Sequence, residues 1–299
     1  MHTTEISCPS RRRRALVLGG GGSAGNAWLI GVVAGLREAA LDVTEADLIV
    51  GTSAGATAAV QITTADPAHL LADILAAPSP GTPGAARASS DMVAEQMRRT
   101  AEIIDSAGDL ADMRRRMGAF ALSRPASSDA GAQQRWRATV ASRLPTTDWP
   151  VQAVTLTAVD AVSGVPVMFD RNSGVAVADA VAASCSSGFA LRIGDGWFID
   201  GGYRSNADNA DVAAGYERVL VLSPFGGATR TPANWRAGLA AQAAELRAAG
   251  TTVEIVRPDS AARAAFGDNM MDLSARAPAA RAGAAQGRDL AAQLRAFWS

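Results

Sequence analysis

The sequence predicts an α/β fold with three layers, in which helices cover both faces of a mostly parallel central sheet. Short apolar stretches that end in glycine alternate with helix-like segments, most clearly in residues 15–41 and 47–62. This alternation is typical of strands joined through helices, which makes neighbouring strands parallel. The 299 residues, 48% of them hydrophobic, suffice for one such domain with insertions.

The expected elements follow one another in a regular order. Residues 15–18 form the first strand, a glycine-rich loop covers residues 19–25, and a helix that is apolar on most sides follows over residues 26–41. The second strand runs directly into a glycine-flanked turn and a helix of small residues. Later elements are expected as strands at 151–160, 165–170, 191–200, 218–224 and 252–258, a small-residue helix at 177–189 and a long helix at the C-terminal end.

Residues 78–130 interrupt the alternation of strands and helices. The segment begins with a stretch rich in proline, glycine and serine and continues as amphipathic helices that carry methionine and arginine. We interpret it as a helical insertion. Its methionine and leucine stripe fits an ordinary packing face, and an adaptable apolar cover over an acyl site is the alternative.

Composition excludes several classes of function. The net charge is −1 and the pI is near 6.2, whereas nucleic-acid binding needs a dense basic surface, so we expect no nucleic-acid partner. Two cysteines give no disulfide framework. The only histidines are His2 and His69, so we expect no metal site and no metal cofactor.

The N-terminal residues predict no targeting segment. Four arginines precede only four apolar residues before the glycines begin, which is too short for the apolar core of a secretion signal. The longest largely apolar piece, residues 24–36, is well short of a membrane span. We expect a cytoplasmic protein whose N-terminal tail, residues 1–13, is flexible and solvated.

The turn after the second strand reads Gly51-Thr52-Ser53-Ala54-Gly55. A Gly-x-Ser-x-Gly turn between a strand and a helix lifts a serine hydroxyl above the sheet, and its glycines avoid collisions on either side. The amides at the start of the following helix favour negative charge beside the serine. Ser53 is therefore a candidate nucleophile, although an incidental serine in a tight turn gives the same pattern.

A serine nucleophile needs a base, and histidine is a poor candidate here. His69 lies 16 residues after Ser53, at an expected helix start, and no histidine follows it. A carboxylate can serve when it lies against the hydroxyl and is partly desolvated, since burial raises its proton affinity. Asp200 ends an apolar run, and Gly201 and Gly202 behind it leave room for a substrate. An ordinary Asp-Gly turn is the alternative interpretation.

The glycine-rich loop also has two interpretations. Gly20, Gly22 and Gly25 match the dinucleotide-binding fingerprint by spacing, but the second strand lacks the acidic residue that holds a ribose. The sequence contains no lysine, which excludes the other common phosphate loop. A bare glycine loop at a strand end can instead direct backbone N–H groups at an oxyanion. We expect such donors from Gly20, Gly21, Gly22, Ser23 and Ala54.

The glycine-rich loop, the GTSAG turn and the DGG stretch, in this order and without a histidine, resemble the patatin-like phospholipase family. The resemblance covers about residues 14–225, and residues 267–287 look similar to the C-terminal segment of that family. It implies a patatin-like three-layer fold with a catalytic domain over residues 14–225. Residues 226–299 then add a strand and helices packed on the same domain.

The resemblance also implies a site and an activity. Ser53 is the nucleophile and Asp200 the base of a Ser–Asp dyad that hydrolyses lipid acyl esters through an acyl-enzyme, with no organic cofactor. We expect a lipid or ester substrate, and transient contact with a membrane surface for lipids. Transfer of the acyl group to an alcohol instead of water is equally compatible. The glycines that support these motifs are Gly25, Gly51, Gly55, Gly201 and Gly202.

Two departures from the family pattern bear on activity. The family loop usually reads GGGxRG with a basic residue in the fifth place, where this sequence has Ala24. Residues 187–191 also lack the prolines that usually surround the aromatic residue there. The alternative function is therefore a catalytically weak or inactive relative that binds lipid or protein, and a nucleotide-binding protein ranks behind both.

Overall fold

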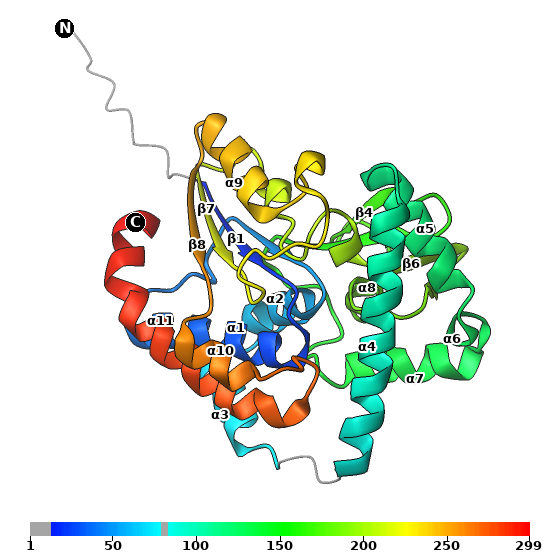
Figure 1. Ribbon diagram of the computed structural model, residues 1–299. Coiled ribbons are helices and arrows are strands. Elements are labelled where there is room, and N and C mark those ends of the chain that lie inside the picture. The colour runs from blue at the N-terminus through cyan, green and yellow to red at the C-terminus, as the bar shows by residue number, and fades with distance from the viewer. Residues whose placement is uncertain (1–12, 79–82) are drawn as a thin grey trace, which may run out of the picture.

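The computed structural model describes residues 13–78 and 83–299. The expected flexible tail over residues 1–13 therefore falls, apart from its last residue, outside the described residues. The described chain forms one eight-stranded sheet with helices on both faces, as the sequence predicted (Figure 1).

The central sheet is mostly parallel. Its strand order is β5-β6-β3-β2-β1-β7-β8, with β4 paired to β3 off this path. The run from β3 to β8 is parallel, and the antiparallel pairs are confined to β4, β5 and β6 at the other end. The strands are β1 (Arg14–Leu18), β2 (Leu48–Gly51), β3 (Val154–Asp160), β4 (Pro166–Phe169), β5 (Leu191–Ile193), β6 (Gly196–Asp200), β7 (Arg218–Leu222) and β8 (Thr252–Val256).

Helices connect and cover these strands. They are α1 (Gly22–Glu38), α2 (Ala54–Thr64), α3 (Pro67–Ala76), α4 (Pro83–Ser106), α5 (Leu110–Leu122), α6 (Pro125–Ser128), α7 (Ala130–Ala141), α8 (Val177–Ser184), α9 (Leu239–Ala248), α10 (Ser260–Phe266) and α11 (Arg276–Trp298). Figure 1 shows α4 to α7 gathered at one side of the molecule, beside β4 and β6. This helical segment, which the sequence placed at 78–130, continues to residue 141.

The two faces of the sheet carry separate cores because side chains alternate along each strand. In β1, Leu16 and Leu18 pack with α1, α2 and α11 on one face. Ala15 and Val17 pack with α9 on the other. All four are fully buried. The central strands are therefore apolar throughout, which is the pattern expected of parallel strands covered on both faces.

Helices α1 and α11 lie side by side and run in the same direction. Their glycines bring the two backbones into direct contact, since a Cβ on Gly35 would come within 2.1 Å of the Ala284 carbonyl oxygen. A Cβ on Gly287 would likewise meet the Val32 carbonyl oxygen at 2.3 Å. Parallel packing places the N-termini of both helices at the same end of the sheet.

Two boundaries differ from the sequence prediction. Helix α1 begins at Gly22, inside the expected glycine loop, because the Gly25 amide already donates to the Gly21 carbonyl oxygen at 2.9 Å. Helix α8 ends at Ser184 instead of continuing to residue 189. The shorter α8 leaves Cys185 and Ser186 in a turn that lies against the end of β6, where the Asp200 amide donates to the Ser186 carbonyl oxygen at 3.0 Å.

Candidate active site

Ser53 lies on a strained turn directly after β2. Its backbone has φ 53° and ψ −117°, a conformation that non-glycine residues rarely adopt. The flanking glycines are required by space, since a Cβ on Gly55 would come within 1.9 Å of the Leu18 carbonyl oxygen and one on Gly51 within 2.6 Å of the Ala56 Cα. The sequence GTSAG therefore folds into the sharp strand–turn–helix connection that exposes a serine hydroxyl.

Asp200 faces this hydroxyl from the end of β6. Ser53 Oγ donates to Asp200 Oδ2 at 2.8 Å. The sheet register explains the meeting: on β3, Leu156 pairs with Gly51 and Ala158 pairs with Asp200. Asp200 thus lies level with the turn that follows β2. The structure brings together two residues that are far apart in sequence.

The environment of Asp200 raises the proton affinity of its carboxylate. Its side chain is buried, with 7% of its surface exposed. Burial raises its pKa to about 6, and hydrogen bonds from the Gly202 amide at 2.8 Å and the Ser53 hydroxyl partly oppose this rise. Asp200 is mostly ionised at neutral pH but has a higher proton affinity than an exposed aspartate.

The sequence predicts oxyanion donors at Gly20, Gly21, Gly22, Ser23 and Ala54, and the hydrogen bonds of their backbone amides differ. The Gly20 amide is already bonded to the Ala207 carbonyl oxygen at 2.8 Å, so it is occupied within the chain. Within residues 13–78 and 83–299, the amides of the other four residues have no hydrogen-bond acceptor. These available donors are Gly21, Gly22, Ser23 and Ala54. Gly20 itself remains next to the serine, since a Cβ on it would lie 3.4 Å from the Ser53 Cβ.

Asn209 is a residue that the sequence analysis missed. It is fully buried, in the left-handed conformation with φ 55°. Its Nδ2 donates to Thr52 Oγ1 at 3.0 Å, to Thr157 Oγ1 at 3.3 Å and to the Gly201 carbonyl oxygen at 2.9 Å. Asn209 therefore joins the residue before Ser53 to the residue after Asp200. The only sequence signal was an asparagine shortly after the DGG stretch, a residue type that tolerates this backbone.

The segment at the end of α8 also holds the turn at Ser53. Ser184 Oγ accepts a hydrogen bond from the Ser53 amide at 2.9 Å, and Cys185 Sγ donates to the Ser53 carbonyl oxygen at 3.1 Å. Burial, followed by the charge of Asp200, raises the pKa of the Cys185 thiol to about 12. Both contacts keep the strained turn in place, and the thiol stays protonated near neutral pH.

Two other residues singled out in the sequence, His69 and Ala24, lie on helices. His69 is exposed in the first turn of α3. Among the described residues, no group of histidine, cysteine or carboxylate side chains could hold a metal ion. Ala24 is buried in α1, and its amide donates to the Met270 carbonyl oxygen at 2.9 Å. No helix in the described part of the chain is long and apolar enough to cross a membrane.

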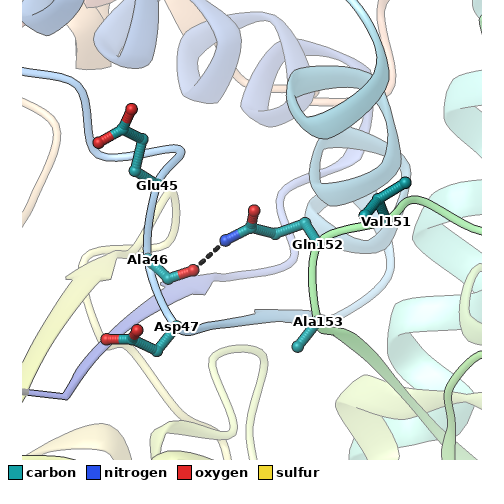
Figure 2. Close-up of a pocket in the computed structure, with 6 residues that line it drawn as sticks. All are labelled: Glu45, Ala46, Asp47, Val151, Gln152 and Ala153. Carbon is teal, nitrogen blue, oxygen red and sulfur yellow. Dashed lines mark hydrogen bonds between the residues drawn. The ribbon is translucent and has the colours of Figure 1, made fainter.

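A surface hollow of about 450 Å³ lies at the opposite end of the sheet (Figure 2). It is formed by residues 45–47 and 151–153, which precede β2 and β3, whereas Ser53 follows β2. Its polar groups serve the fold: Asp47 accepts from the Arg14 amide at 2.7 Å, and Gln152 donates to the Ala46 carbonyl oxygen. We assign no function to this hollow.

Comparison with the sequence patterns of known protein families shows the family of this chain. The sequence pattern of the patatin-like phospholipases matches residues 16–213, about two thirds of the chain. The chain belongs to the patatin-like phospholipase family. The match ends before β8 and α11, so the patatin-like region includes Ser53 and Asp200 but not the C-terminal helices.

Similarity to individual proteins is weak. VipD from Legionella pneumophila gives a TM-score of 0.44 at 14% sequence identity, over 95% of this chain and 67% of that one. The type III effector ExoU gives 0.32 at 16% identity, over 94% of this chain and 54% of that one, so this chain spans about half its length. No curated protein sequence matches this chain.

Proposed function

We propose that this patatin-like protein is a serine hydrolase that cleaves carboxylic esters of lipids, with Ser53 as nucleophile and Asp200 as base. The observation that carries the proposal is the 2.8 Å hydrogen bond from Ser53 Oγ to Asp200 Oδ2. A hydroxyl that donates to a buried carboxylate is oriented for transfer of its proton.

In the first half-reaction, Ser53 Oγ attacks the ester carbonyl carbon while its proton moves to Asp200 Oδ2. The negative charge that develops on the carbonyl oxygen is stabilised by amides of Gly21, Gly22 and Ala54. One such donor typically contributes about 3–4 kcal/mol to lowering the barrier. The C–O bond to the alcohol then breaks, Asp200 returns the proton to the leaving oxygen, and the acyl group stays on Ser53.

In the second half-reaction, water replaces the alcohol. Asp200 accepts a proton from the water as its oxygen attacks the acyl carbon, and the same amides hold the second oxyanion. The bond between the acyl carbon and Ser53 Oγ then breaks, Asp200 gives its proton to Oγ, and the carboxylic acid is released. The strained backbone of Ser53 supports both steps, because it fixes the hydroxyl in one position instead of letting it rotate with a flexible loop.

Apolar side chains near the glycine loop support a lipid as substrate. Met271 is half exposed, and its Sδ lies 2.8 Å from the position of a Cβ on Gly22. Phe225 is also half exposed and follows Pro224, which packs on Gly21. An acyl chain or a lipid surface would bury both side chains next to the reacting ester.

The test uses a short p-nitrophenyl ester, which needs no lipid surface. We expect the protein to release p-nitrophenol and to react with a fluorophosphonate probe, whose adduct mass spectrometry places on Ser53. Ser53→Ala should abolish both, and Ser142→Ala, at an exposed helix end, should leave both unchanged. Hydrolysis that persists in Ser53→Ala would remove the proposal.

Failure of the wild-type protein to react with the probe would favour the alternative function, a relative that binds lipid without turnover. Ala24 motivates this alternative, because the family usually places a basic residue there. A panel of phospholipids, lysophospholipids and glycerides, read by mass spectrometry of the released fatty acids, then defines the substrate.

A further inference from the structure

One short segment after the DGG stretch contacts all three loops of the proposed site. The Ala207 carbonyl oxygen accepts a hydrogen bond from the Gly20 amide of the glycine loop at 2.8 Å. Two residues later, Asn209 Nδ2 donates to Thr52 Oγ1 at 3.0 Å, in the turn at Ser53. The same nitrogen donates to the carbonyl oxygen of Gly201 at 2.9 Å, in the turn after β6. Residues 207–209 therefore lie where the three loops meet.

The backbone of Asn209 is fixed in a conformation that few residue types tolerate. Its φ of 55° and ψ of 42° are left-handed, a region that asparagine enters more readily than most residues. Asn206 Oδ1 accepts hydrogen bonds from the amides of Asp208 at 2.7 Å and of Asn209 at 2.9 Å. These bonds hold the loop closed, so they set the direction in which the Asn209 side chain leaves the backbone.

The side-chain amide of Asn209 can face the two turns in only one orientation. Its Oδ1 accepts hydrogen bonds from Ser205 Oγ at 2.8 Å and from Arg204 Nη1 at 3.1 Å. A guanidinium group has donors only, so an exchange of Oδ1 and Nδ2 would place two donors against each other. The hydrogens on Nδ2 therefore point toward Thr52 and Gly201.

This connection between the two turns is shielded from water. Asn209 and Thr52 are fully buried. In the part of the chain that the structure describes, no other side chain outside the Ser53–Asp200 pair hydrogen-bonds to both turns. The strained backbone of Ser53 also persists only where its surroundings hold it. Loss of the Asn209 amide would leave buried groups of both turns without a partner and free the turns to move apart.

We propose that Asn209 is a positioning residue, which keeps Ser53 Oγ within hydrogen-bond reach of Asp200 Oδ2 by joining the two turns. The inference rests on the proposed hydrolase function and adds to it a residue that touches neither the substrate nor the reacting atoms. Proton transfer requires a separation near the observed 2.8 Å. A displacement of about 1 Å can lower a rate by about a hundredfold.

The test compares the loss of two buried hydrogen-bonding side chains. Asn209→Gly removes the amide, while glycine keeps the left-handed backbone without strain. Thr251→Val is the control, since buried Thr251 donates to the Tyr216 carbonyl oxygen at 2.8 Å and precedes β8, at the opposite end of the sheet. For p-nitrophenyl butyrate, we expect Asn209→Gly to lower kcat/KM by about tenfold to a hundredfold. Thr251→Val should stay within about threefold, at a temperature where circular dichroism shows both variants folded.

The pH profile separates positioning from a general loss of stability. The hydrogen bond from Ser53 lowers the pKa of Asp200. If Asn209→Gly lengthens that bond, the midpoint of kcat/KM against pH should move above that of the wild type, whereas Thr251→Val should leave it unchanged. Thr52→Val, which keeps the side-chain shape, should shift the midpoint in the same direction with a smaller loss of activity. The losses from Thr52→Val and Asn209→Gly should combine to less than their sum.

Crystal structures of the wild type and of Asn209→Gly give a measurement that needs no turnover. We expect the distance from Ser53 Oγ to Asp200 Oδ2 to lengthen beyond about 3.5 Å in the variant. An unchanged distance would overturn the inference whether or not the wild type is active. So would an unchanged pH midpoint, strict additivity with Thr52→Val, or a loss of kcat/KM no larger than in Thr251→Val. Failure of the wild type to hydrolyse the ester would instead count against the proposed function.

Discussion

Asp200 and Asp208 are two buried carboxylates eight residues apart, and their surroundings differ. Both have a pKa raised to about 6, in each case mainly by burial. Asp200 accepts hydrogen bonds from Ser53 Oγ and the Gly202 amide. Asp208 has an oxygen without a partner, and that oxygen lies against Gly19. Because the two pKa values are raised alike, the proposal that Asp200 and not Asp208 is the base rests on the group that each carboxylate faces.

Replacement of each aspartate by asparagine should give the largest difference between the two sites. Asp200→Asn should lower kcat/KM for a p-nitrophenyl ester by at least about 10³-fold, because it leaves the Ser53 proton without an acceptor. Asp208→Asn is the matched control and should leave that value within a few-fold. Steady-state kinetics on both variants decides. Equal losses would mean that Asp208 also takes part in the chemistry.

Asp208→Asn should increase the stability of the folded protein, whereas Asp200→Asn is expected to decrease activity. Its folded pKa of about 6 lies above the ordinary value of 3.8, so the folded state binds more protons between these values and loses stability as pH rises through that window. Asp208→Asn removes this penalty, and at pH near 7 we expect a gain of up to about 3 kcal/mol in the free energy of unfolding. Urea titrations at pH about 4 and 7 measure it. A variant less stable than wild type at pH 7 would contradict the expectation.

The side chain of Asp208 limits the space for a side chain at position 19. A Cβ on Gly19 would lie 2.3 Å from Asp208 Oδ1 and 3.2 Å from Pro224 Cδ. Gly19→Ala should therefore lower the free energy of unfolding by about 1–3 kcal/mol, the usual cost of overpacking. Added to Asp208→Ala, which removes the nearer contact, the same change should cost less than it does alone. A double-mutant cycle in urea measures the difference, and strict additivity would exclude the clash.

The pH profile of activity should follow Asp200. Only the ionised carboxylate can accept the Ser53 proton, so kcat/KM should rise with pH through about 6 and then level off. Below that value we expect about a tenfold fall per pH unit. Asp208→Asn should keep the midpoint. A profile whose midpoint stays near 4 would show that Asp200 titrates as an exposed aspartate.

The smallest effect concerns a third acidic group near the site, the partly buried thiol of Cys185. The Cys185 thiol also adjoins Ser53, but its pKa is raised to about 12, mainly by burial. Thiolate is the reactive form, so iodoacetamide at pH about 8 should modify Cys185 slowly in the folded protein and quickly in urea. Mass spectrometry of the peptide that contains Cys185 follows the reaction. Equally fast labelling in both states would contradict the raised pKa of this thiol.

The fold could be predicted from the sequence because its signals are local. Apolar strands that end in glycine, such as residues 48–51, gave the parallel sheet, and the strand-ending Asp200 drew attention by its chemistry. The end of α8 was predicted too late because small residues continue past Ser184 without a breaker, whereas the contacts with the Ser53 turn end the helix there. Tertiary contacts decided that boundary.

Other parts of the site carry no local signal. Asn209 acts through hydrogen bonds to two turns that are distant in sequence, and Arg276 contacts Ser23 across 253 residues. The hydrogen bond from the Gly20 amide to the Ala207 carbonyl oxygen likewise joins segments that are distant in sequence. The roles of Ser53, Asp200 and the remaining amides stay predictions that the kinetic experiments address.

The direct backbone contact between α1 and α11 couples the position of the C-terminal helix to the proposed active site, because α1 begins in the glycine loop. A Cβ on Gly283 would lie 2.5 Å from the Trp28 carbonyl oxygen. A methyl group added there must therefore move α1 and α11 apart or shift one helix along the other. Such a displacement would move Arg276, the first residue of α11. Substitutions along this helix contact should therefore alter the geometry of the proposed active site from a distance.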